Sequence, residues 1–224
     1  HHAIAVRAAI VAESGDHLAA LTFHEQALEL SRRLSLRRRE GIDLANLGES
    51  KLACGLLDEA LASFQEALAI FVAIGDRACE GDCSFNVGRV LLALSREEEA
   101  ERMLSFAHAR CVETGRREYA ALAAVSLAEL ARSRGDDGGA DRFADAAVAT
   151  FRAIGSHHLW RALGVAAELK ERAGELAAAR DLAVEAAALV DTLRVGLPTE
   201  GARVTFERDA APIAALAHRL ASAP

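Results

Sequence analysis

The feature that most constrains this chain is a recurrence of small residues at steps of 40, with a last step of 39. Stepping from Gly55 in both directions reaches Gly15, Ser95, Gly135 and finally Gly174. Small residues also recur at three fixed distances from these anchors. Five positions after them stand Ala20, Ala60, Ala100, Ala140 and Ala179, and twelve positions after them stand Ala27, Ala67, Ala107, Ala147 and Ala186. Seven positions before them stand Ala8, Gly48, Gly88, Ala128 and Ala167. A fixed period of this size is typical of a stacked array of one structural unit.

Residues 44–71 show the unit most clearly, as two amphipathic helical segments joined by a tight turn at Gly55. Ala60 and Ala67 are two helical turns apart and therefore share one face of the second helix. Gly48 lets a neighbouring helix approach the first one closely. This stretch predicts a helix–turn–helix hairpin whose contact surface is built from small residues.

Applied along the chain, the pattern predicts an array over residues 1–194, with hairpins at about 1–35, 36–75, 76–115, 116–155 and 156–194. Ser95 with Glu98 is expected to form a capping box. Residues 195–224 are expected to form a turn containing Pro198 and then a capping helix. That helix should begin after an N-cap at Thr199 and could break near Pro212, because proline disrupts a helix interior.

The second hairpin resembles the tetratricopeptide repeat (TPR), through Leu47-Gly48, Gly55, Ala60, Phe64 and Ala67. The period of 40 exceeds the usual 34 or so, and the family proline after the second helix is absent. Both departures resemble the long TPRs of large bacterial regulators and of kinesin light chain. The resemblance implies an all-α fold, a right-handed α-solenoid of about five hairpins plus the C-terminal capping helix, with a concave groove lined by the first helices.

The groove is where the resemblance places a ligand. In register, polar or charged side chains recur on the inward face of the first helices of the second to fifth hairpins. These candidate ligand-binding residues are Asn46, Glu49, Asn86, Arg89, Ser126, Glu129, Arg132, Arg161 and Glu168.

Asn46 and Asn86 occupy the position at which TPR proteins often hold a ligand backbone. A side-chain amide both donates and accepts, so it can hydrogen-bond a peptide unit twice. The alternative is that both asparagines only bridge adjacent helices. Lys51 and Lys170 fall away from the positions that a carboxylate clamp requires, so recognition of a C-terminal carboxylate is not favoured.

The net charge of −7 argues against a nucleic-acid-binding protein. The run Arg37-Arg38-Arg39 is the local exception, and we interpret it as a solvated face between helices. No apolar run approaches the roughly 18 residues of a membrane span, and no signal peptide is visible at His1-His2, which are consistent with a tag remnant. We therefore expect a cytoplasmic protein that binds neither nucleic acid nor membrane.

No cofactor, metal or catalytic group is predicted. Cys54, Cys79, Cys83 and Cys111 lie at unequal repeat positions, which favours buried thiols over a disulfide framework. His157 and His158 are expected at a helix start, where adjacent residues do not face each other and make poor joint metal ligands.

The sequence therefore favours a non-enzymatic scaffold that binds a peptide or protein segment, as a regulatory or sensor module of a larger bacterial protein. An alternative is the TPR arm of a caspase-like CHAT peptidase or of a multidomain transcriptional regulator, whose active domain would lie outside this chain. Residues 193–208 resemble the junction that follows TPR arrays in TPR–CHAT proteins. A further hypothesis is self-association through the ends of the array.

Overall fold

The computed structural model describes residues 1–197 and 199–222; Pro198 of the expected turn and the last two residues of the expected capping segment lie outside this range. The described residues are all-α, and they form two compact units, residues 1–116 and 117–224, which are considered one at a time. No helix of the described residues is long and apolar enough to cross a membrane.

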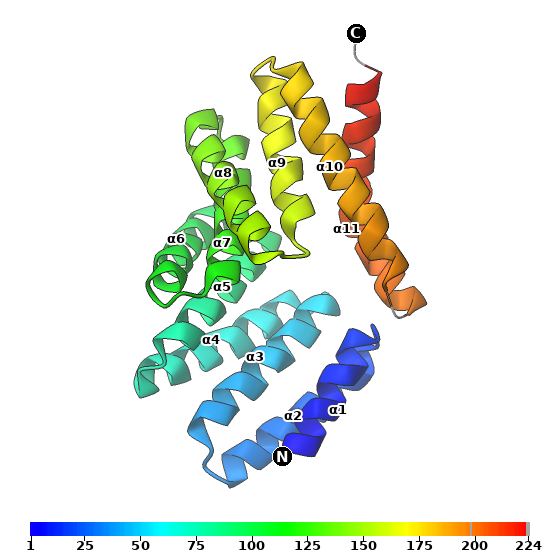
Figure 1. The fold of residues 1–224 in the computed structure, drawn as a ribbon. Coiled ribbons are helices and arrows are strands. Elements are labelled where there is room, and N and C mark those ends of the chain that lie inside the picture. Colours follow the sequence, from blue (N-terminus) through cyan, green and yellow to red (C-terminus); the bar gives the residue numbers. More distant parts are fainter. Residues whose placement is uncertain (198, 223–224) are drawn as a thin grey trace. The chain divides into compact units, whose positions relative to one another are not determined.

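Unit 1 consists of three antiparallel helical hairpins, each packed against the next (Figure 1). Their helices are α1 (His2–Glu13) with α2 (His17–Arg33), α3 (Arg37–Ala53) with α4 (Leu57–Ile74), and α5 (Arg77–Ala93) with α6 (Glu97–Glu113).

Unit 2 contains two further hairpins and a last helix. The hairpins are α7 (Arg117–Ser133) with α8 (Asp137–Ile154) and α9 (Leu159–Arg172) with α10 (Leu176–Val195). The last helix, α11 (Glu200–Ala221), packs on both α10 and α9, in the place that the first helix of another hairpin would take. Hairpins that stack in chain order confirm the predicted solenoid fold class.

The recurring small residues are the contact points of the hairpins. All fifteen lie buried in the structure, including Gly48 and Gly88. A Cβ atom on Gly48 would lie 2.9 Å from the Phe64 ring, and one on Gly88 would lie 2.7 Å from Leu104. In the fourth and fifth hairpins alanine replaces this glycine, and the facing residues are the small Ala144 and Ala183. A glycine on the first helix is therefore paired with a large residue on the second, and an alanine on the first helix with an alanine on the second.

Every turn within and between the hairpins contains a residue of positive φ, and these residues recur about every 20 positions. Seven are glycines, for which this backbone conformation carries no steric cost, whereas the other two are Ser35 and Ser95, with φ of 53° and 59°. The predicted N-cap role of Ser95 is wrong: Arg96 is the N-cap of α6, because Ser95 is used to end α5 in the left-handed conformation.

The last helix agrees with the prediction at its start and differs from it in the middle. Thr199 caps α11, with its hydroxyl accepting a hydrogen bond from the Ala202 amide at 3.2 Å. The helix continues through Pro212, which lies on its exposed side, while Ile213, Leu216 and Leu220 on the opposite side are buried. Packing of that apolar stripe keeps the helix continuous despite the missing backbone donor.

A second difference concerns the start of the fifth hairpin. Helix α9 begins at Leu159, so His157 and His158 lie in the preceding turn and not in the helix. Their ring centroids are 3.9 Å apart, and the ring planes are tilted by 42° relative to each other. The expectation that they point apart is wrong, because it assumed helical geometry for both.

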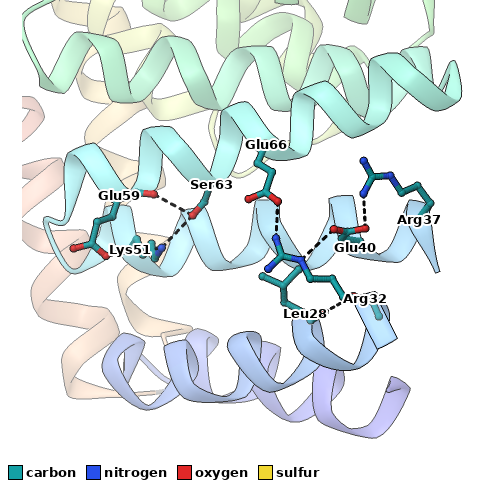
Figure 2. Close-up of polar contacts among 9 residues, drawn as sticks. Leu28, Arg32, Arg37, Glu40, Lys51, Glu59, Ser63 and Glu66 are labelled. Atoms are coloured by element: carbon teal, nitrogen blue, oxygen red, sulfur yellow. Dashed lines mark hydrogen bonds and ion pairs between the residues drawn. The ribbon is translucent and has the colours of Figure 1, made fainter. Parts of the chain in front are cut away.

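Charged side chains connect the first two hairpins of unit 1 (Figure 2). Arg32 at the end of α2 donates to Glu40 on α3 at 3.1 Å and to Glu66 on α4 at 2.5 Å. Arg37 donates to the same Glu40 carboxylate at 2.7 Å. Burial opposes ionisation of Glu40, but the two guanidinium groups outweigh it and lower the pKa of this carboxyl group. Because these contacts join α2, α3 and α4, they help to fix the alignment of the two hairpins.

Candidate functional site

The nine candidate residues lie on the first helices of four hairpins, but they divide between the two units. Unit 1 holds Asn46 and Glu49 on α3 with Asn86 and Arg89 on α5. Unit 2 holds the other five, on α7 (Ser126, Glu129 and Arg132) and α9 (Arg161 and Glu168). We call them the unit 1 face and the unit 2 face.

The unit 1 face is joined by hydrogen bonds between adjacent hairpins. Arg89 donates from Nη1 to Glu49 Oε1 at 3.0 Å and to Asn86 Oδ1 at 3.2 Å. Its guanidinium carbon also lies 5.5 Å from the centre of the Phe85 ring. The Glu49 carboxylate, the Arg89 guanidinium and the Asn86 amide therefore form one polar group across α3 and α5.

The two asparagines of this face are not equivalent. Asn86 is only 5% exposed, and its side-chain oxygen already accepts a hydrogen bond from Arg89 on the same helix, α5. Asn46 is half-buried, and no described residue hydrogen-bonds its side chain. Its amide therefore keeps a donor and an acceptor that a bound peptide unit could use.

The unit 2 face is a cluster of two acids and two bases. Arg132 on α7 forms an ion pair with Glu168 on α9. Glu129 is half-buried, and this burial raises the pKa of its carboxyl group, with Arg161 and Arg132 opposing the effect and Glu168 adding to it. Carboxyl groups with shifted pKa values occur at functional sites and in structural ion-pair networks.

Buried Ser126 also belongs to the unit 2 face. The buried Nε of Arg132 has no hydrogen-bond partner in the described part of the chain. Charges held partly out of water on a helix face gain more from a charged or polar ligand than solvated charges do. This face therefore suits a segment that carries both signs of charge.

The four cysteines are free thiols, as expected. Burial raises the pKa of Cys83 and Cys111 to about 12 and that of Cys79 to about 11. Asp82, the acid closest in sequence to Cys83, accepts hydrogen bonds from Arg116. Cys83 and Cys111 are buried, as expected, whereas Cys54 and Cys79 are half-buried, and none of the four is among the residues of either face.

A buried polar group in unit 1 was not predicted from the sequence. Asp43, 1% exposed, is 2.6 Å from the Nε2 atom of His1 and interacts with His24. His24 takes the position that Phe64 and Leu104 occupy in the next two hairpins, and its buried Nδ1 has no hydrogen-bond partner among the residues that the structure describes. The sequence did contain a signal for this group, because a histidine stands at a register position that is apolar in the next two hairpins.

Comparisons with known proteins agree with this geometry. Residues 42–111 match the family model described as tetratricopeptide repeat. No curated protein matches the sequence significantly. Solved structures that share the fold include BtubC (BKLC) from P. vanneervenii, at a TM-score of 0.71 and 18% identity over 85% of this chain and 79% of that one.

Two further solved structures share the fold and differ in how much of their own length this chain covers. A putative kinesin light chain with nearly identical TPR-like repeats from Podosopora anserina has a TM-score of 0.64 and 18% identity, over 84% of this chain and 93% of that one. A Rap protein complexed with competence and sporulation factor has a TM-score of 0.65 and 19% identity over 96% of this chain. The chain spans 62% of that Rap protein. At these identities the likeness concerns the fold.

Proposed function

We propose that this chain, of which residues 42–111 match the tetratricopeptide-repeat family model, is a non-enzymatic scaffold that binds an extended peptide or protein segment on the first helices of its hairpins. The observation that carries the proposal is the unit 1 face, where no described residue hydrogen-bonds the Asn46 amide, which shares α3 with Glu49 of the joined Glu49–Arg89–Asn86 group. An amide next to an organised pair of charges can hold a peptide backbone and select a polar neighbour. The mixed charges of the unit 2 face support a second contact region.

A finer proposal is that the scaffold is a cytoplasmic regulatory or sensor module of a bacterial protein. The structures named above include a Rap protein complexed with competence and sporulation factor, which supports peptide sensing as one use of this fold. The arm of a CHAT peptidase or of a transcriptional regulator remains the alternative, and it rests on the resemblance of residues 193–208. The sequence on either side of this chain in its gene distinguishes these roles.

The binding proposal is tested with a display library of random 12-residue peptides, whose enriched members are titrated against the protein by fluorescence anisotropy. We expect the double variant Asn46→Ala/Asn86→Ala to bind about 2- to 13-fold more weakly, because Asn46 would lose a hydrogen bond worth about 0.5–1.5 kcal/mol, whereas the buried Asn86 is already bonded to Arg89. Gln65→Ala, an exposed amide on the second helix α4, is the matched control and should bind normally. Equal affinity of the double variant and wild type would exclude the unit 1 face as the binding surface.

A further inference from the structure

Two histidines and a glutamate from adjacent hairpins of unit 2 converge outside the proposed binding faces. The Glu118 carboxylate and the rings of His157 and His158 each place one ligand atom within 4.8 Å of the others. Glu118 lies in the first turn of α7, and the histidines lie in the turn between α8 and α9. The cluster thus depends on the stacking of two hairpins and is not visible as a local motif.

The turn that carries the histidines is structurally defined. Gly155 ends α8 in the left-handed conformation, and the Ser156 amide then donates to the Phe151 carbonyl at 3.0 Å. The Ser156 hydroxyl donates to Glu118 Oε1 at 2.8 Å and accepts from the His158 amide at 3.2 Å. One serine therefore orients both the carboxylate and the backbone of a histidine, which is the supporting role that outer partners of metal ligands perform.

The equivalent place in unit 1 shows what this arrangement replaces. There Arg38, at the register position of Glu118 and His158, donates to Asp76 Oδ2 at 2.8 Å. Asp76 is in register with Ser156. The Arg38 guanidinium supplies the positive charge that balances the Asp76 carboxylate. In unit 2 the acid has moved to the preceding hairpin, and His157 and His158 follow Ser156 where Arg77 and Ala78 follow Asp76 in unit 1.

We propose that Glu118, His157 and His158 form a binding site for a divalent transition-metal cation such as Zn²⁺. Two neutral imidazoles and a carboxylate are a ligand set that Zn²⁺ accepts, at distances of about 2.0–2.2 Å. Closing the present separations onto one ion needs side-chain shifts of about an ångström, which the rings in the turn can make by rotation about χ1 and χ2. Three protein ligands leave a coordination position for water or for a donor atom of a partner.

The site is distinct from the peptide-binding faces and does not depend on that proposal. A cation here would tie the start of α7 to the turn before α9, and so connect the two hairpins of unit 2 through ligands 39 and 40 residues apart. Metal binding requires deprotonated imidazoles, so the affinity should be lower at acidic pH.

The test is a titration of the full chain with Zn²⁺ by isothermal calorimetry at pH 7.5, repeated at pH 5.5. Because His1 and His2 could bind metal themselves, all variants carry His1→Ala and His2→Ala. We expect one bound equivalent in this background, and at least tenfold weaker binding in Glu118→Gln and in His157→Ala/His158→Ala. His218→Ala, an exposed histidine on α11, is the matched control and should retain the affinity.

A second readout separates loss of the site from loss of the fold. Circular dichroism should show unchanged helix content in each variant, and added Zn²⁺ should raise the melting temperature of the background protein and of His218→Ala only. Absence of saturable binding in the background protein would overturn the proposal. Equal affinity in His157→Ala/His158→Ala would overturn it as well.

Discussion

At the scale of single residues, the turns carry strain at two identifiable positions. Ser35 and Ser95 adopt a left-handed conformation that costs an L-residue about 1–2 kcal/mol. We expect Ser95→Gly to raise the free energy of unfolding by up to about 1 kcal/mol, because part of this relief is offset by the larger entropy of glycine in the unfolded chain. Urea denaturation measures the change. The reverse substitution Gly55→Ala, at φ 77°, should destabilise, and a loss of stability in Ser95→Gly would contradict this account.

His24 predicts a pH dependence of stability. Burial lowers the pKa of His24 below its usual 6.5, against the opposing charge of Asp43, so the folded state favours the neutral ring. The unfolded chain then binds more protons, and the free energy of unfolding falls as the pH drops below 6.5 toward the folded-state pKa. Burial raises the pKa of Asp43 above 3.8, so stability decreases as the pH rises from 3.8 through the folded-state pKa of that group.

The substitution His24→Leu isolates the histidine contribution, because Leu104 occupies the same register in the third hairpin. Urea denaturation at pH 7.5 and 5.5 should show a smaller loss of stability on acidification in His24→Leu than in wild type. His17→Leu, a partly exposed histidine on α2, should keep the wild-type slope. Identical slopes in wild type and His24→Leu would mean that another group controls this pH range.

At the scale of helices, the close approach of α5 and α6 depends on Gly88. An added Cβ would lie 2.7 Å from the side chain of Leu104, which is fully buried and has no room to withdraw. We expect Gly88→Ala to destabilise by about 1–2 kcal/mol, since overpacking of about 1–3 kcal/mol exceeds the gain in helix propensity. Gly201→Ala makes the same change in α11, where nothing lies within 4 Å, and should be neutral or stabilising. Thermal unfolding of the two variants measures these opposite effects.

At the scale of the whole molecule, the helices contact their neighbours in chain order within each compact unit. Stability in such arrays is approximately a sum of repeat and nearest-neighbour terms. We therefore expect Gly88→Ala to increase amide hydrogen exchange first in α5 and α6, while α9 and α10 keep their protection. Exchange followed by mass spectrometry measures this, and an equal loss of protection in all helices would indicate one cooperative unfolding unit instead.

The sequence alone determined the repeat period, the hairpins and the small buried residues at their contacts. These features follow from local rules: a helix repeats every 3.6 residues, glycine permits left-handed turns, and only small side chains allow close helix packing. Ser95 and the pair His157-His158 departed from the prediction because each lies next to a helix boundary, where neighbouring turns decide the backbone conformation.

Only the tertiary structure decided which side chains from different hairpins meet. It placed Arg89 against Glu49, left the Asn46 side chain without a hydrogen-bond partner among the described residues, and brought Glu118 to the two histidines. Such meetings join residues about 40 positions apart. They depend on how one hairpin is rotated and shifted on the next, which is set by packing of the whole interface and has no counterpart in the local pattern of residues.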